Sequence, residues 1–551
     1  MSDRPLIVQS DRTMLLDVHS TAAAPCRDEI APFSELVKSP EHLHTYLISA
    51  ISLWNACSSG LDSKAIIDTL ERWSRFSIPE PVDYFIRETC SRYGIVSFSP
   101  CDERTFFVCV EGSFHRAQLL SLPQVRRLLI DPDEETPRAL MRDRGVLKLA
   151  LIAKDYPVRD LIPLKKGPHL GLGLRSVRLS GSPFTVRPYQ SQAFDSFWAG
   201  GRPGAGYGAV VLPCGSGKTI VGLVAMACLQ TTTLILAPNV AALHQWRREI
   251  LDKTTLDESL IGEYSALEKE IRPVTLCTYS MLAVSGGDDG EYRHLDLMEK
   301  QDWGLVIYDE VHVLPAPVFR FSANLQAVCR LGLTATLVRE DGREKDVFTL
   351  VGPKRYDVPW SELEKDGYIA KAWCHELRVS LADSVMMDYA TASGRGRHAI
   401  AATNPAKLDV VAALLERHSD RQILIIGQYL DQLEEIRRRF GFEMITGRMP
   451  NARREELYDA FREGRIKVLI VSKVANYAID LPDASVAIQV SGTYGSRQEE
   501  AQRLGRILRP KEVDSHFYTL VSRHTVEESY SLNRQKFLVE QGYSYEVENW
   551  S

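Results

Sequence analysis

Two series of short, wholly apolar segments constrain the fold of this chain more than any other feature of its sequence. The segments are rich in residues that favour strands, and helix-forming stretches separate each from the next. Strands that are apolar on both faces are typical of parallel sheets covered by helices, and their alternation with helices indicates β-α-β units. We therefore predict two α/β domains in tandem, with strands at residues 209–212, 234–237, 274–277, 305–308 and 331–333, and at 423–426, 468–471, 486–490 and 517–520.

The length and composition place these two domains in a larger globular chain. At roughly 150 residues per domain, the 551 residues suggest three or four domains. Apolar residues make up 44% and charged residues 25%, which excludes wholesale disorder. The net charge of −6 excludes a uniformly basic surface. It permits a local basic groove, because net charge carries no information about the distribution of charge.

Membrane, secretory and metal-cluster classes find no support in the sequence. No apolar run approaches the roughly 18 residues that span a bilayer, and the first residues are charged too soon for a signal peptide. The ten cysteines include no Cys-x-x-Cys pair, so neither a zinc ribbon nor an iron–sulfur cluster is expected. Buried, unpaired cysteines fit the reducing cytoplasm, where we expect the protein to act.

Changes in composition divide the rest of the chain. Residues 1–130 combine short strands, a helical period over 41–95 and a hairpin of 95–98 with 106–110, which predicts an α+β module of winged-helix-like form. Such modules bind DNA in some proteins and act as spacers in others, and both interpretations stay open. Residues 131–183, rich in Pro, Gly and mixed charge, are expected to be a connector. The α/β domains would then occupy 184–375 and 407–551, with an irregular insertion at 376–406.

A glycine-rich loop after the strand at 209–212 predicts a phosphate site. It reads Leu212-Pro213-Cys214-Gly215-Ser216-Gly217-Lys218-Thr219, and a helix-forming stretch follows. Glycines let backbone N–H groups turn around a phosphate, the lysine reaches the β- and γ-phosphates, and the threonine hydroxyl reaches Mg²⁺. The start of a helix also favours an anion. Leu212 stands where the strict pattern has glycine, so these residues alone leave a plain strand–helix turn as an alternative.

Two further groups suit a site that hydrolyses a nucleotide. Asp309 and Glu310 follow the strand at 305–308, where the first carboxylate can hold Mg²⁺ and the second can activate the attacking water. Arg506 and Arg509, three residues apart on one helix face, can stabilise charge on a γ-phosphate as arginine fingers do. Taken singly, a solvated strand end and a basic surface helix are the alternatives.

In combination, these segments resemble the superfamily 2 helicases, and among them the XPB family in its compact prokaryotic form. The loop of that family begins Leu-Pro-Cys-Gly, so Leu212 agrees with its pattern. The likeness covers nearly the whole chain and implies two RecA-like motor domains with an N-terminal module and a short thumb-like insertion at 376–406. Residues 309–312 resemble motif II, 331–341 motif III with an Arg-Glu-Asp element, 471–482 motif V, and 495–510 motif VI.

The resemblance also implies roles for individual residues. At the nucleotide, Arg187 and Gln190 would read adenine, Asp480 would sense the nucleotide or its ribose, and Gln502, Arg506 and Arg509 would close the catalytic site from the second domain. The segment of Arg187 and Gln190 also reads as a helix start with Pro188 in its first turn, and both interpretations can hold together.

Other residues would contact DNA or couple it to the nucleotide. Strand-tip loops with Pro238, Asn239, Thr278 and Tyr279 would grip the DNA backbone, and His312, Thr334 and Thr336 would couple the two sites. Arg339, Glu340 and Asp341 would act as a strand-separating or damage-sensing wedge. In the insertion, Arg395, Arg397 and His398 are candidates for phosphate contact, with a solvated loop as the alternative.

The resemblance implies an ATP- and Mg²⁺-dependent DNA 3′→5′ helicase that acts on single-stranded, duplex or forked DNA, in a pathway such as nucleotide excision repair. We expect a monomer of the cytoplasm, associated with the nucleoid, working beside a nuclease or repair factor, since the sequence shows no nuclease signature. Binding through backbone contacts carries little sequence preference and weakens steeply with salt. A double-stranded DNA translocase without processive unwinding and an ATP-gated DNA-binding switch are the alternatives, and RNA is a minor one.

Overall fold

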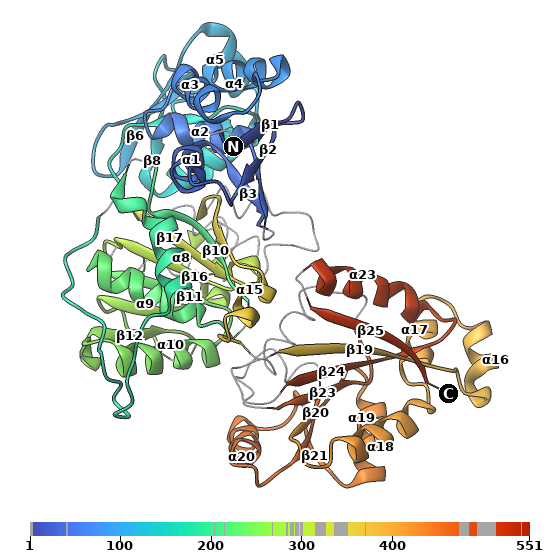
Figure 1. The fold of residues 1–551 in the computed structure, drawn as a ribbon. Helices are drawn as coiled ribbons and strands as arrows, with labels where there is room; N and C mark the ends of the chain where they lie inside the picture. The colour runs from blue at the N-terminus through green and yellow to red at the C-terminus, as the bar shows by residue number, and fades with distance from the viewer. Residues whose placement is uncertain are drawn as a thin grey trace. The chain divides into compact units, whose positions relative to one another are not determined.

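In the computed structural model the chain forms two compact units (Figure 1). The first unit holds the elements from β1 to β18 and the second those from α15 to β25. Within the described ranges, no helix is long and apolar enough to cross a membrane. The structure describes residues 4–39, 42–164, 166–202, 204–213, 215–266, 268–282, 285–286, 291–292, 297, 301–313, 325, 327–335, 351–369, 371–472, 484–492, 514–540 and 543–550.

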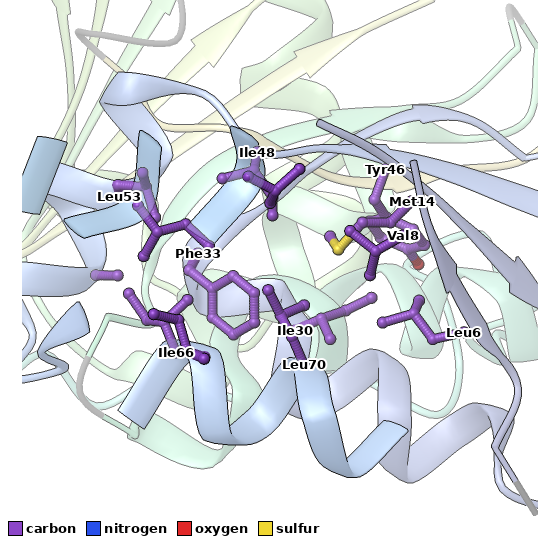
Figure 2. Packing of buried hydrophobic residues seen from close by; sticks show 14 of the residues in the cluster. Leu6, Val8, Met14, Ile30, Phe33, Tyr46, Ile48, Leu53, Ile66 and Leu70 are labelled. Atoms are coloured by element: carbon purple, nitrogen blue, oxygen red, sulfur yellow. The ribbon is translucent and has the colours of Figure 1, made fainter. Parts of the chain in front are cut away.

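The chain begins with a four-stranded antiparallel sheet in the order β1-β2-β4-β3, packed against helices. Figure 2 shows its core, in which the ring of Phe33 lies among aliphatic side chains such as Ile30, Ile66 and Leu70. The elements are β1 (Leu6–Val8), β2 (Thr13–Asp17), α1 (Ala23–Ile30), β3 (Glu35–Lys38), β4 (Leu43–Leu47), α2 (Ala50–Ser58), α3 (Ser63–Trp73) and α4 (Glu80–Ser91).

The helical period predicted over 41–95 starts too early. Residues 43–47 form strand β4, which pairs with β2 and β3, and the helices begin at Ala50. The apolar residues Leu43 and Leu47 are spaced like one helix face, but pairing with strands distant in sequence decides the conformation. Local periodicity does not contain that information.

A second, five-stranded sheet in the order β7-β8-β6-β5-β9 completes the N-terminal part. It contains β5 and β6, whose antiparallel pairing confirms the predicted hairpin. The helices α2–α4 and this hairpin belong to different cores, so they do not form the expected winged-helix-like unit. The elements are β5 (Val96–Pro100), β6 (Thr105–Val110), α5 (Ser113–Leu120), α6 (Pro123–Arg126), β7 (Leu129–Ile130), β8 (Arg138–Leu140), α7 (Arg144–Ile152) and β9 (Val158–Asp160).

The connector expected at 131–183 is wrong over its first half. Strands β8 and β9 and helix α7 lie in that range and contribute Leu147 and Leu151 to the core of the second sheet. The mixed charge that suggested a solvated connector is partly internal. Arg144, 2% exposed, pairs with Asp160 at 2.9 Å, and Lys148 approaches the same carboxylate at 2.5 Å.

The first α/β domain has a seven-stranded parallel sheet in the order β12-β13-β11-β16-β17-β10-β18. All five predicted strands are confirmed as members of it. The elements are α8 (Pro188–Trp198), β10 (Tyr207–Val211), α9 (Lys218–Leu229), β11 (Thr233–Ala237), α10 (Val240–Lys253), β12 (Ile261–Tyr264), β13 (Val274–Thr278), α11 (Tyr279–Leu282), β16 (Leu305–Asp309), β17 (Cys329–Thr334) and β18 (Lys354–Asp357), with a short ribbon of β14 (Ser285–Gly286) and β15 (Glu291–Tyr292).

Edge strand β18 joins this sheet to the N-terminal part. The half-buried Arg355 guanidinium donates hydrogen bonds to the carbonyl oxygens of Ala31 and Gly204, both at 2.8 Å, and of Tyr207 at 3.1 Å. One side chain thus connects the helical layer of the N-terminal part to the α/β sheet.

The second unit has a parallel sheet in the order β21-β22-β20-β23-β24-β19-β25. The four strands predicted here are confirmed. The elements are α15 (Trp360–Lys365), β19 (Ala372–Val379), α16 (Asp383–Thr391), α17 (Gly394–Ala402), α18 (Lys407–Arg417), β20 (Ile423–Gly427), α19 (Leu430–Phe440), β21 (Glu443–Ile445), α20 (Asn451–Arg462), β22 (Val468–Ser472), β23 (Val486–Gln489), β24 (Ser515–Ser522), α23 (Val526–Glu540) and β25 (Ser544–Trp550).

The border expected between residues 375 and 376 falls inside strand β19. This strand pairs with β24 over its whole length and with β25 from Trp373 to Val379, so the second sheet begins before the expected insertion. The remainder of 376–406 is helical: α16 and α17 follow β19, and His398 of α17 is 2% exposed, with Nδ1 2.8 Å from the Tyr429 hydroxyl. His398 therefore belongs to the interior of this unit.

A buried histidine predicts how the stability of the second unit depends on pH. Burial and the nearby His516 lower the pKa of His418, whose Nε2 lies 2.9 Å from the Tyr518 hydroxyl, to about 4. The unfolded chain therefore binds more protons between that value and the ordinary histidine pKa of about 6.5. The contribution of the neutral His418 imidazole to the stability of the folded unit is complete above pH 6.5 and is lost as pH falls towards 4. We expect the free energy of unfolding to drop by about 2–3 kcal/mol over this range.

The measurement is denaturant unfolding of the second unit at a series of pH values. His418→Gln removes the titrating group, so its unfolding free energy should change less over the same interval. An equal pH dependence in this variant would contradict the assignment.

Candidate active site

The glycine-rich loop occupies the predicted position between strand β10 and helix α9. Gly215 and Gly217 have φ angles of 78° and 81°, in the left-handed region that glycine adopts without strain. The fully buried Ser216 donates a hydrogen bond from Oγ to the Pro213 carbonyl oxygen at 2.6 Å, which closes the turn. Lys218 and Thr219 then begin α9. Backbone N–H groups at a helix start form a concave site suited to an anion.

The acidic pair lies at the same edge of the sheet as this loop. Asp309 ends β16 and Glu310 follows it, and only β17 separates β16 from β10. Carboxyl ends of parallel strands meet at one edge, and the Lys218 Nζ is 3.5 Å from the Glu310 Oε1. Glu310 has a φ of 48°, which is uncommon outside glycine and concentrates at functional sites. The structure therefore brings together Lys218 and Glu310, which lie 92 positions apart in the sequence.

The two carboxyl groups have opposite pKa shifts. Burial raises the pKa of Asp309 to about 6, and the neighbouring Glu310 charge adds to this effect. For Glu310, burial acts in the same direction, but Lys218 and His312 outweigh it and leave its pKa below the usual range. Glu310 is thus the more acidic member of the pair, and a cation beside Asp309 would lower the pKa of that carboxyl again.

This donor set suits a hydrated divalent ion and an attacking water. The buried Glu310 Oε2 has no hydrogen-bond partner among the described residues, although the His312 Nδ1 lies 3.4 Å away. Such an acceptor can orient a water molecule. Oxygen ligands on Asp309 and Thr219 are the kind that Mg²⁺ takes in nucleotide sites.

Asp309 accepts hydrogen bonds from two side chains that are distant from it in the sequence. The Trp246 indole donates from Nε1 to the Asp309 Oδ2 at 3.0 Å, and the Tyr279 hydroxyl donates to the Asp309 carbonyl oxygen at 2.8 Å. Sequence reasoning missed Trp246 and gave Tyr279 only a DNA contact. The bond joins residues 63 positions apart, and no spacing rule anticipates it.

The predicted coupling residues form a chain from the acidic pair to β17. The His312 Nδ1 lies 2.6 Å from the Thr334 hydroxyl, and both side chains are buried. Since His312 also faces Glu310, a change at the end of β17 can reach the acidic pair through one imidazole.

At the start of α8, the interpretation of Arg187 and Gln190 as a helix start is confirmed. The Gln190 Oε1 accepts from the Arg187 backbone N–H at 3.0 Å, and Pro188 occupies the first helical position. Gln190 is 3% exposed. Its contact with adenine stays a prediction.

Two of the predicted DNA-contact residues, Asn239 and Thr278, lie within hydrogen-bond distance of neighbours in their own segments. The Asn239 Oδ1 caps α10 by accepting from the Ala242 N–H at 2.9 Å, and the buried Thr278 hydroxyl lies 3.0 Å from the Ser280 hydroxyl. In the second unit, Arg395 is exposed, while Arg397 lies over the Tyr389 ring at 5.4 Å.

The predictions for Cys214, Thr336, Arg339, Glu340, Asp341, Asp480, Gln502, Arg506 and Arg509 fall outside the described residues.

Three family models match parts of the chain. Residues 363–550 match the model described as ERCC3/RAD25/XPB C-terminal helicase. Residues 183–339 match that of the type III restriction enzyme res subunit, and residues 6–131 match a helicase conserved C-terminal domain.

Named relatives are similar over almost the full length. The chain is 48% identical to the DNA 3′-5′ helicase XPB of Mycobacterium tuberculosis, over 99% of this chain and 98% of that one. It is 47% identical to the protein of the same name from Kineococcus radiotolerans, over 99% and 97%. It is 31% identical to the general transcription and DNA repair factor IIH helicase/translocase subunit XPB/SSL2 of Saccharomyces cerevisiae, over 99% and 72%.

A solved structure supports the fold. The ATP-dependent type ISP restriction-modification enzyme LlaBIII bound to DNA aligns with a TM-score of 0.51 and 14% identity, over 67% of this chain and 32% of that one. Identity at this level shows the shared architecture alone.

Proposed function

The chain belongs to the XPB family of DNA 3′-5′ helicases, and on this premise we propose that the edge of the first α/β sheet is its ATP-hydrolysing site. As a helicase of this family it uses ATP and acts on DNA. The observation that carries the site assignment is the approach of Lys218 to Glu310 at 3.5 Å, at the carboxyl ends of β10 and β16.

We propose the following division of labour within the first α/β domain. The Lys218 ammonium binds the β- and γ-phosphates, and the loop of Pro213 to Gly217 surrounds them with backbone N–H groups. The ionised Glu310 orients the attacking water through its open oxygen and receives its proton. Thr219 and Asp309 would hold Mg²⁺, which neutralises phosphate charge when bound.

The remaining roles rest on the resemblance of motifs. Arg187 and Gln190 bind adenine, and Asp480 senses the nucleotide. Gln502, Arg506 and Arg509 contribute from the second α/β domain and stabilise the charge that develops on the γ-phosphate. Because they come from a separate domain, hydrolysis requires that domain to close on the nucleotide. Pro238, Asn239, Thr278 and Tyr279 contact the DNA backbone, with Arg395 and Arg397 as further phosphate contacts.

We propose a role in DNA repair, on forked or damaged duplexes. The eukaryotic relatives whose names include DNA repair support this pathway. A nuclease or repair factor would act on the DNA that the motor opens, and the protein would work as a monomer at the nucleoid. A double-stranded DNA translocase stays the second candidate, since the name of the yeast relative combines helicase and translocase.

One experiment separates these candidates. Unwinding of 3′-tailed, 5′-tailed and bubble duplexes is measured beside displacement of a third strand from a triplex. A 3′→5′ helicase opens the 3′-tailed duplex and leaves the 5′-tailed one intact. Triplex displacement without opening of any tailed duplex would establish the translocase instead.

The Arg-Glu-Asp element predicts a separation of unwinding from hydrolysis. If Arg339, Glu340 and Asp341 form a wedge between the strands, replacing all three with alanine should lower the unwinding rate about tenfold and leave DNA-stimulated ATP hydrolysis within about twofold. Both rates are measured on the same tailed duplex. Equal losses in the two rates would show that the element serves the motor as a whole and is no wedge.

A further inference from the structure

Asp309 accepts hydrogen bonds from two buried donors, each on a helix that directly follows a predicted DNA-contact loop. Trp246 belongs to α10, the helix that begins directly after Pro238 and Asn239, and Tyr279 directly follows Thr278. Their hydrogen bonds to Asp309 measure 3.0 and 2.8 Å. Trp246 is 1% and Tyr279 2% exposed, so water does not compete for either bond.

The sheet order explains why both side chains reach the same residue. Strands β13, β11 and β16 are consecutive neighbours, so the loops after β13 and β11 lie beside the tip of β16. From the elements that follow these strands, Tyr279 at the start of α11 and Trp246 of α10 both reach Asp309. An indole N–H is a donor only and its ring is rigid, so the direction of the Trp246 bond is fixed by the position of α10.

Trp246 also contacts the helix that follows the phosphate loop. A Cβ atom at Gly222 of α9 would lie 2.6 Å from the Trp246 Cη2 and 3.4 Å from the Ile307 Cδ1. The absence of a side chain at Gly222 therefore lets the indole enter the layer between α9 and the sheet. One ring, carried by the helix after a predicted DNA loop, thus contacts both α9 and Asp309.

From this arrangement we infer that Trp246 and Tyr279 are positioning residues that transmit DNA contact at the two loops to Asp309. The inference rests on the proposed function, because it takes Asp309 as the Mg²⁺ carboxylate and the loops as DNA contacts. When DNA moves α10 or the tip of β13, the two donors move with it. The Asp309 carboxylate and main chain then follow, because neither bond can be exchanged for water. Nucleotide and DNA affinities are thereby linked, and the linkage is reciprocal.

The test removes each donor and retains the ring. Trp246→Phe lacks the N–H, and Tyr279→Phe lacks the hydroxyl. Calorimetry gives the affinity for ADP with Mg²⁺, with and without a DNA duplex, and requires no turnover. We expect DNA to change the affinity of wild type for ADP by at least about fivefold. In the two variants, this effect of DNA should be much smaller or absent. Binding of DNA without nucleotide should stay within about twofold of wild type for Trp246→Phe, because this indole is buried and is not a proposed DNA contact.

A matched control shows whether the effect is specific. The Trp54 indole also donates one buried hydrogen bond, to the Thr89 carbonyl oxygen at 3.1 Å, in the N-terminal part. Trp54→Phe should leave the linkage between DNA and nucleotide unchanged. Gly222→Ala, which displaces the indole and keeps its N–H, should weaken the linkage as Trp246→Phe does.

The outcomes separate this inference from the proposed function. Suppose that wild type hydrolyses ATP in response to DNA. If DNA then changes the nucleotide affinity of both variants as much as that of wild type, or leaves the wild-type affinity unchanged, the inference is overturned and the proposed function stands. If wild type shows no DNA-stimulated hydrolysis, the proposed function itself fails. Should Trp246→Phe not fold, Tyr279→Phe decides alone, because it removes a single hydroxyl.

Discussion

Lys218→Ala should lower DNA-stimulated ATP hydrolysis by about 10²–10³-fold, with DNA binding in the absence of nucleotide unchanged. Its ammonium lies 3.5 Å from Glu310, in a site where side chains are largely shielded from water. A charge aimed at the phosphates in such a site is worth far more than on the surface. Loss of the lysine also removes one of the two charges that lower the Glu310 pKa against burial, so the pKa of this carboxyl should rise in the variant.

Glu310→Gln distinguishes binding from chemistry in the same site. The amide keeps the shape of the side chain but cannot take a proton, so turnover should fall by about 10²-fold or more while ATP still binds. Because Lys218 and Glu310 act as a unit, the double variant should lose little more than Lys218→Ala alone. Lys253→Ala is the matched control, since this lysine is also buried in the first α/β domain and pairs with Glu249 at 2.9 Å. ATP turnover retained by Lys218→Ala would refute the site.

The sheets and the meeting of Lys218 with Glu310 could be predicted because both depend on rules of parallel topology. A strand buried on both faces is apolar throughout, so its position is visible in the sequence. Residues that follow two such strands meet at one edge whatever the distance between them along the chain. That geometry places the loop after β10 beside the acids after β16.

The features that could not be predicted depend on contacts between distant residues, which local sequence patterns do not reveal. Arg144 and Asp160 lie in a range whose mixed charge predicted a connector, but paired with each other they are part of a core. Leu43 and Leu47 matched a helix period until pairing with β2 and β3 decided otherwise. The bond of Trp246 to Asp309 exists because Gly222 leaves room for the indole, a condition set by the packing of α9.

Lys407→Met should destabilise the second unit by about 3–5 kcal/mol, because it leaves a buried carboxylate without its cation. Lys407 is 1% exposed and its Nζ lies 2.8 Å from the Glu527 Oε2. The ammonium also donates to the carbonyl oxygens of Ala402 and Val490, each at 3.1 Å. Glu527 in turn accepts from the Ser522 N–H at 2.9 Å. Lys407, at the start of α18, thus binds the end of α17 and the residue after β23. Glu527, at the start of α23, binds the end of β24.

The double variant Lys407→Met with Glu527→Leu shows whether the loss comes from an unpaired charge. Well-packed apolar groups often replace a buried ion pair with little change in stability, so the double variant should regain most of the loss. Stability is followed by hydrogen exchange of the amides of β24. Arg439→Met is the control, because its pair with Asp409 at 2.8 Å is exposed and should be worth less than about 1 kcal/mol. A double variant as unstable as Lys407→Met would show that the carbonyl contacts carry the effect. In that case the position of Val490, which precedes the segment with Arg506 and Arg509, would depend on the ammonium itself.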